Sequence, residues 1–249
     1  MSKPYVCHFC GALLSETTAH EFDDKILCTH CLDEHTTFCD GSLDDGIEIV
    51  SHPMTLDYHR NEMNWRDVLA KAVDLGYTSH NAGSCGLHIH CSRDFFGSDT
   101  EEQEISVGRI IYLTERFWNE LVKFSRRTTG SLNRWAAKYA TISETVLETY
   151  QRAKDKDMGR YVAVNLTNYA TIEFRLFRGT LRYETFMAAL QLVDEICRTA
   201  VRLYDSDIEN LSWSEFVQRI DRETKPELIA YLKSRRLYVN DITAETEEY

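Results

Sequence analysis

One stretch, residues 171–179 with the sequence TIEFRLFRG, alternates apolar and polar side chains as a β-strand does. Its side chains divide into an apolar set, Ile172, Phe174 and Leu176, and a second set, Thr171, Glu173, Arg175 and Phe177. A second alternating run, residues 160–168, ends at the short join 168–170. We therefore expect the two runs to form an antiparallel hairpin.

Two further runs, residues 46–51 and 86–92, separate apolar from polar side chains in the same way. The polar side chains of these runs and of residues 160–168 include Glu48, His88, His90 and Asn165. We expect all four runs to share one sheet, with its apolar face packed against helices and its polar face displaying these groups. Simple exposure to water would also explain a polar face. This face, however, holds no lysine and is rich in groups that bind metals and anions, which favours a site.

Helices are predicted where apolar residues recur every three or four positions. The expected helices span residues 61–76, 99–126, 143–154, 186–204, 212–220 and 226–235. Gly76 stands where a glycine commonly ends a helix, and the helix from residue 99 begins with acids and closes on bases, in agreement with the helix dipole. The strands and helices together predict an α+β fold, in which helices cover one face of an antiparallel sheet.

Four of the eight cysteines form two Cys-x2-Cys turns, and the other four are single. The paired residues are Cys7, Cys10, Cys28 and Cys31, and residues 25–27 form a weak strand that enters the second pair. Four thiolates at this spacing predict a structural zinc site, which would stabilise the fold without activating water; coincidental spacing is the alternative. We expect a zinc module over residues 1–38, a main domain over 39–240 and a frayed acidic tail over 241–249.

The composition excludes some functions. With 28 basic and 40 acidic residues the formal net charge is −12, which opposes binding to a phosphate backbone, so nucleic acid is not expected as a main partner. The chain shows no apolar leader and no run of 18 apolar residues. We therefore expect a cytoplasmic protein that does not span a membrane.

Five motifs follow one another along the main domain: Asp40-Gly41-Ser42-Leu43, residues 46–53, Gly86-Leu87-His88-Ile89-His90, Val164-Asn165-Leu166 and residues 171–181. Together they resemble the amidoligase family, relatives of glutamine synthetase and glutamate-cysteine ligase in the carboxylate-amine ligase superfamily. A Gly-x-His-x-His strand and an Arg-x-Glu-x-Arg strand line the nucleotide and metal site of glutamine synthetase, and residues 86–90 and 172–175 are similar to them. The Cys pairs resemble a zinc module of some phage and bacterial members. The resemblance implies an antiparallel sheet of the glutamine synthetase type.

The resemblance also implies ATP-dependent amide formation, in which a carboxylate becomes an acyl phosphate that an amine attacks. The substrates would be ATP with a small-molecule or peptide carboxylate and amine, and the cofactor would be Mg²⁺ or Mn²⁺. The implied roles are Glu48, His88 and Glu173 as magnesium ligands, Arg175 and Arg178 as phosphate or carboxylate clamps, and His90 and Asn165 as substrate or nucleotide contacts, with Glu48, His88, Glu173 and Arg175 as the catalytic set.

The role of Arg178 depends on a structural condition, and a basic group near the site has two interpretations. Arg178 has the opposite parity to Arg175, so its role requires a bulge or the end of the strand. A basic group after the helix of residues 99–126 would belong either to the rim of the site or simply to a basic helix end; its members are Arg126, Arg127, Asn133, Arg134 and Trp135.

The family's opening Gly-x-Glu-x-Glu strand, which supplies metal carboxylates, has no counterpart before Asp40. We hypothesise that its loss leaves the site short of ligands and impairs activity. The alternative function is a noncatalytic interaction protein, in which the zinc module binds a protein partner and a degenerate ligase domain serves as the scaffold. A metal-dependent hydrolase would use His88 and His90, but the His-Glu-x2-His signature is absent.

Overall fold

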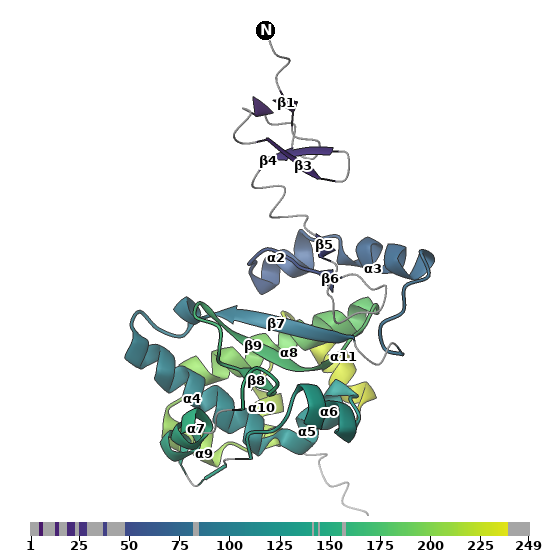
Figure 1. The fold of residues 1–249 in the computed structure, drawn as a ribbon. Coiled ribbons are helices and arrows are strands. Elements are labelled where there is room, and N and C mark those ends of the chain that lie inside the picture. Colours follow the sequence, from purple (N-terminus) through teal and green to yellow (C-terminus); the bar gives the residue numbers. More distant parts are fainter. Residues whose placement is uncertain are drawn as a thin grey trace, which may run out of the picture. The chain divides into compact units, whose positions relative to one another are not determined.

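The structure, a computed structural model, divides the chain into two units, Met1–Met63 and Asn64–Tyr249 (Figure 1). It describes residues 48–81, 85–140, 142–143, 145–155 and 158–238, and the strand backbone of residues 5–6, 13–14, 19–22, 25–28 and 37–38. Cys7, Cys10, Cys31 and the side chain of Cys28 lie outside this description, as does the predicted tail 241–249. The zinc site therefore stays a prediction.

The first unit, where it is described, consists of three strand pairs and one helix. The antiparallel pairs are β1 (Tyr5–Val6) with β2 (Leu13–Leu14), β3 (Ala19–Phe22) with β4 (Lys25–Cys28), and β5 (Thr37–Phe38) with β6 (Glu48–Ile49). Helix α2 (Leu56–Asn61) begins after Thr55, whose hydroxyl accepts a hydrogen bond from the Tyr58 N–H. Strand β4 confirms the strand predicted at residues 25–27.

One strand prediction was wrong in its pairing. The expected run 46–51 contributes β6, which pairs with β5 and does not belong to the sheet that carries the other three runs. Alternation tells which side chains share a face of a strand, but it does not tell which strand lies alongside. In this chain β6 pairs with the nearest preceding strand.

The second unit contains a three-stranded antiparallel sheet in the order β7-β9-β8. These strands are β7 (Gly86–Ser92), β8 (Val164–Asn165) and β9 (Thr171–Arg178). The predicted hairpin is confirmed, with Val164 opposite Phe174 and Asn165 opposite Glu173. Figure 1 shows β9 in the middle of the sheet, between the long strand β7 and the short strand β8.

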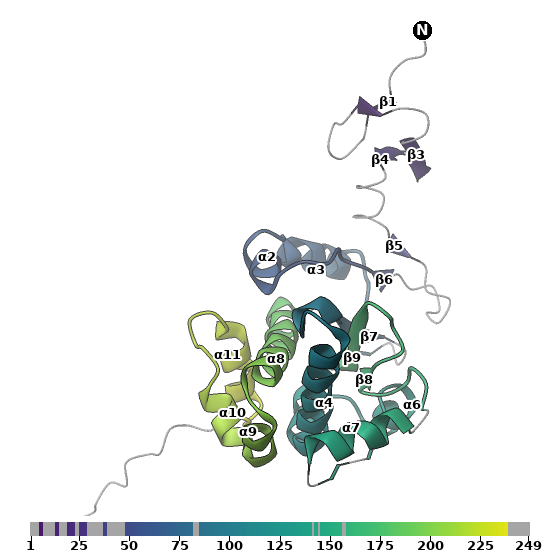
Figure 2. The same cartoon turned by 90° about the vertical axis from the view of Figure 1, so that its left-hand side faces the viewer.

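Helices supply most of the rest of the second unit. They are α3 (Trp65–Asp74), α4 (Thr100–Arg116), α5 (Trp118–Ser125), α6 (Thr129–Trp135), α7 (Val146–Asp155), α8 (Tyr183–Arg202), α9 (Asp205–Asn210), α10 (Trp213–Gln218) and α11 (Pro226–Ser234), with a 3-10 turn η1 (Arg93–Phe95). Figure 2 shows α4 and α8 between the sheet and the group α9–α11. The predicted α+β class is confirmed for the described part of the chain.

The predicted helix over residues 99–126 is two helices in the structure. Helix α4 begins after Asp99, whose carboxylate accepts from the Glu102 N–H, and ends before Phe117. Phe117 is buried and its ring contacts Trp213 and Phe216, so a tertiary contact marks the break. No glycine or proline stands there to announce it. The helix end at Gly76 is confirmed by the left-handed φ of 86° at that residue.

The central strand β9 is buried on both sides. Ile172 and Phe174 lie in the core, as the apolar parity predicts, but Glu173 and Arg175 are also buried. The predicted polar side is therefore covered on β9, whereas Gly86, His88 and His90, the residues of β7 on that side, are exposed. Among the described residues, no helix has the length and apolar character needed to cross a bilayer.

Candidate active site

A bulge between β7 and β9 decides which side chains share a face. Leu87 pairs with Phe177 and Ile89 pairs with Phe174, so β9 has one more residue than β7 between these two pairs. Phe177 therefore turns to the apolar side, where it is 2% exposed and its ring contacts Phe124. Simple alternation, which assigned Phe177 to the polar set, was wrong at this point.

The same bulge returns Arg178 to the polar side. Arg178 lies opposite Gly86, which has the parity of His88 on β7. The bulge that a shared face for Arg175 and Arg178 requires is thus present in the structure. The Nη2 atom of Arg178 donates to the His80 carbonyl oxygen, so this guanidinium is directed toward the loop before β7.

The carboxylate of Glu173 is the centre of the polar face. The residue is only 4% exposed, and each oxygen of its carboxylate accepts a hydrogen bond. Oε1 accepts from Arg175 Nη1 at 2.5 Å, and Oε2 accepts from Asn165 Nδ2 at 2.8 Å. Asn165 is itself oriented, because its Oδ1 accepts from the Thr167 N–H at 2.9 Å. A fixed carboxylate of this kind presents a defined negative charge to its neighbours.

Two imidazoles face the same carboxylate oxygen. His88 Nδ1 lies 3.3 Å and His90 Nε2 3.9 Å from Glu173 Oε1, while His90 Nδ1 lies 3.1 Å from Thr171 Oγ1. Burial lowers the pKa of His88 to about 4, helped by Arg175 and opposed by Glu173. His88 is therefore neutral at neutral pH, and its ring can accept a hydrogen bond or bind a cation.

Two guanidinium groups complete the cluster. Arg175 Nε reaches the Trp135 carbonyl oxygen at 3.5 Å, and Arg127 Nε donates to the Phe177 carbonyl oxygen at 3.1 Å. Burial, followed by the charge of Arg175, lowers the pKa of Arg127 to about 10. Of the basic group predicted at the rim, Arg127 and Trp135 adjoin the cluster, whereas the exposed members are Arg126, Asn133 and Arg134.

The predicted site residues are thus divided between the two units. The second unit alone brings together His88, His90, Asn165, Glu173 and Arg175. Glu48 belongs to the first unit, where it lies exposed on β6.

The cluster meets only in part the needs of the magnesium ion that the resemblance implies. It offers one carboxylate and two imidazoles, whereas Mg²⁺ prefers six oxygen ligands. The cation beside Glu173 Oε1 is the guanidinium of Arg175. Within the described residues, no group of three or more His, Cys, Asp and Glu side chains is arranged to hold a metal ion. These residues fit a magnesium ion incompletely, and they fit an oxyanion held by arginines more directly.

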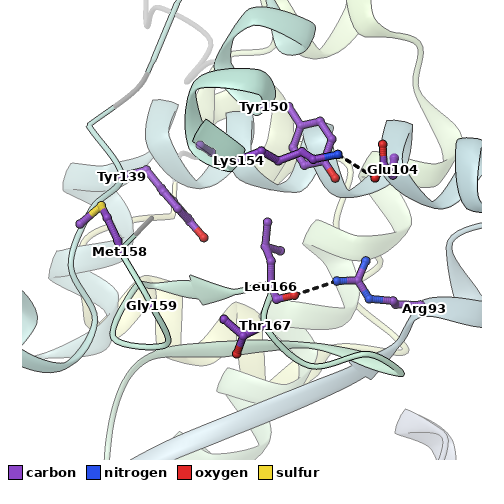
Figure 3. A pocket seen from close by; sticks show the side chains of 10 residues that line it. Arg93, Glu104, Tyr139, Tyr150, Lys154, Met158, Gly159, Leu166 and Thr167 are labelled. Carbon is purple, nitrogen blue, oxygen red and sulfur yellow. Dashed lines mark hydrogen bonds and ion pairs between the residues drawn. The ribbon is translucent and has the colours of Figure 1, made fainter. Parts of the chain in front are cut away.

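A pocket of about 380 Å³ opens at the end of β8, and the sequence predicted none of it (Figure 3). Its lining consists of Arg93, Glu104, Tyr139, Tyr150, Ala153, Lys154, Met158, Gly159, Leu166 and Thr167. Arg93 Nη2 donates to the Leu166 carbonyl oxygen at 3.1 Å, and Lys154 pairs with Glu104 at 2.8 Å. Thr167 joins this pocket to the cluster, since its N–H orients Asn165. No sequence signal marks such a pocket, because its residues come from separate elements.

The second unit is thus an α+β fold whose sheet carries a buried acid, two imidazoles and two guanidinium groups. A family model described as "Putative amidoligase enzyme" matches residues 18–197, which is more than half of the chain. The chain belongs to this amidoligase family. The match begins just before β3, inside the segment that the sequence assigns to the zinc module, and it includes all three strands of the central sheet. No curated protein and no solved structure matches the chain.

Proposed function

We propose that this amidoligase family member is an ATP-dependent ligase that joins a carboxylate to an amine through an acyl phosphate. The single observation that carries the proposal is the buried carboxylate of Glu173, which is held by Arg175 and Asn165 and faced by two imidazoles. Fixed, water-excluded groups of this kind stabilise charge that develops on a transferring phosphoryl group.

The proposed roles follow from these contacts. Arg175 would stabilise the phosphoryl oxygens, because its guanidinium is buried and is held in place by Glu173. Asn165 would keep Glu173 in position. His90, which is half-exposed, would contact the substrate or nucleotide, and Arg178 would act as a further clamp.

The metal ion remains part of the proposal, but no step is derived through it. A bound divalent ion would neutralise phosphate charge. His88 and Glu173 are the proposed ligands from the second unit, and Glu48 remains the predicted ligand from the first. The proposal also includes the hypothesis that loss of the Gly-x-Glu-x-Glu strand impairs the enzyme. It further includes a structural zinc ion held by the four paired cysteines.

The test is ATP hydrolysis with Mg²⁺ and mixed amino acids, comparing the parent chain with Glu173→Gln. We expect turnover in the parent and a loss of at least about 100-fold in the variant, which is typical of removing an electrostatic group from an active site. Glu195→Gln is the matched control, because Glu195 is equally buried and pairs with a base, Lys225, outside the cluster. Equal turnover in the parent and in Glu173→Gln would contradict the assignment.

A second function, a noncatalytic interaction protein with a degenerate ligase domain, is favoured by one observation. Both oxygens of Glu173 are already engaged within the chain, and the described residues hold no group arranged for a metal ion. Nucleotide binding separates the two functions. A ligase should show a rise in melting temperature with Mg²⁺ and ATP, and a scaffold should show none.

A further inference from the structure

The guanidinium of Arg127 is held at one end but not at the other. Helix α5 ends at Ser125, Arg126 adopts a left-handed φ of 60°, and Arg127 then enters the interior beside β9. Its Nε donates to the Phe177 carbonyl oxygen, and its backbone N–H donates to Ser125 Oγ at 3.2 Å. The Nη1 atom is buried and has no hydrogen-bond partner among the described residues. A buried donor that is left unpaired is costly, so such an atom calls for an explanation.

Gly86 allows this arrangement. A Cβ atom at Gly86 would lie 2.5 Å from Arg127 Nη2 and 2.9 Å from His88 Nε2, closer than atoms can approach. Arg127 and His88 therefore converge on the same glycine of β7. Because Gly86 has the parity of His88, the atoms Arg127 Nη2 and His88 Nε2 meet on the polar side of the sheet, where Glu173 and Arg175 lie.

The charges in this region do not balance. Arg127 and Arg175 each carry a positive charge, while Glu173 is the one carboxylate among the described residues that contacts the cluster. That carboxylate is already committed to Arg175 and Asn165. Arg127 is partly buried and its Nη1 atom is withdrawn from water. A cation in such a place without a counter-ion is destabilising, and a bound anion relieves this cost.

We propose that Arg127 and Arg175 form a seat for a phosphoryl oxyanion on the polar face, with Arg127 supplying the unpaired donor. Guanidinium groups recognise phosphoryl oxygens through parallel hydrogen bonds. In Arg175, Nη1 donates to Glu173 and Nε to the Trp135 carbonyl oxygen, whereas Nη2 makes no such bond within the described part of the chain. The inference rests on the proposed function for the source of the group, which is either a nucleotide or free phosphate. The seat itself is defined by this chain's own residues.

The charge test is a titration of the full chain with inorganic phosphate, followed by calorimetry, against chloride at equal ionic strength. We expect Arg127→Met to bind phosphate about ten- to a hundred-fold more weakly, as loss of a charged hydrogen bond predicts, and Arg127→Lys to bind with intermediate affinity. Arg152→Met, at an exposed position of α7, is the control and should bind as the parent does. Parental affinity in Arg127→Met would overturn the proposal.

A steric test removes no charge. Gly86→Ala places a methyl group where Arg127 Nη2 and His88 Nε2 now lie, so phosphate affinity should fall about as far as in Arg127→Met. Gly130→Ala is the matched control, since a Cβ there meets no atom within 4 Å. Circular dichroism establishes that both variants fold. A folded Gly86→Ala chain with parental phosphate affinity would count against the seat.

ATP in place of phosphate separates the two sources and the two proposals. Tighter binding of ATP than of phosphate, lost in Arg127→Met, assigns the seat to a nucleotide, and equal affinity assigns it to free phosphate. Phosphate binding that depends on Arg127 in a chain without ATP hydrolysis would retain the seat and overturn the ligase proposal. ATP hydrolysis in a chain whose phosphate binding does not depend on Arg127 would retain the ligase proposal and overturn the seat.

Discussion

Two clusters of charged groups in the second unit, each built around a buried acid, differ in how they are completed. The first lies between α8 and α11, where Lys225 Nζ contacts Asp194 Oδ2 at 2.8 Å and also pairs with Glu195. Arg198 Nε adds a second bond to Asp194 at 2.8 Å. Two acids thus meet two bases, and each charged group has a partner of opposite sign.

The second cluster, on the polar face of the sheet, has an excess of positive charge. Glu173 is bonded to Arg175, whereas Arg127 has no acid partner among the described residues and an unpaired Nη1 atom. In the α8–α11 cluster every charged group has a partner of opposite sign, so the cluster needs no added ion. The sheet cluster is complete only with an added anion, and this difference separates a structural ion pair from a binding site.

The largest effect should come from breaking the balanced cluster. Lys225→Met leaves Glu195, which is 5% exposed, without its cation, and we expect the free energy of unfolding to fall by about 3–5 kcal/mol. Urea denaturation measures this loss. Lys233→Met, at an exposed position of α11, the helix that follows Lys225, should change stability by no more than about 0.5 kcal/mol. A loss below about 1 kcal/mol in Lys225→Met would show that the pair is not effectively buried.

The sequence predicted the parts of the sheet cluster that depend on local pattern. Alternation along residues 171–175 placed Glu173 and Arg175 together, and the run 86–92 placed His88 beside His90; both pairs converge in the structure. It also indicated that Arg178 needs a bulge or the end of the strand to share the face of Arg175. It could not locate that bulge, because the extra residue appears only when β9 is aligned with β7.

What the sequence missed depends on contacts between distant segments. The pairing of β6 with β5 removed Glu48 from the predicted sheet, and the ring contacts of Phe117 divided one expected helix into two. The burial of Glu173 was not expected either, since a polar strand face is ordinarily open to water. The role of Gly86 could not be predicted from the sequence, because Arg127, which approaches it, comes from a distant segment.

The second largest effect should come from acidification, which lowers the free energy of unfolding through His88 of the sheet cluster. The pKa of His88 is lowered from 6.5 to about 4 in the folded chain, so between these values the unfolded chain binds the proton more readily. Stability is therefore highest above about pH 6.5 and falls as the pH drops toward 4, by about 1–2 kcal/mol after allowance for partial exposure. Urea denaturation at several pH values measures the slope.

The variant His88→Asn isolates this contribution. Without the imidazole, the loss of stability between pH 6.5 and 4 should be smaller by that amount, while other titrating groups act equally in both chains. The variant His59→Asn on α2 serves for comparison of the slope, because burial also lowers the pKa of the His59 ring. An unchanged slope in His88→Asn would contradict the low pKa of His88.

The smallest effect should come from removing a cation from the unbalanced cluster. Arg127→Met takes away one hydrogen bond to the Phe177 carbonyl oxygen, but it also removes a buried charge that has no counter-ion among the described residues. These two changes oppose each other, so the free energy of unfolding without ligand should stay within about 1 kcal/mol of the parent. Urea denaturation in phosphate-free buffer measures it. A loss as large as that of Lys225→Met would mean that Arg127 is already paired and that the two clusters do not differ.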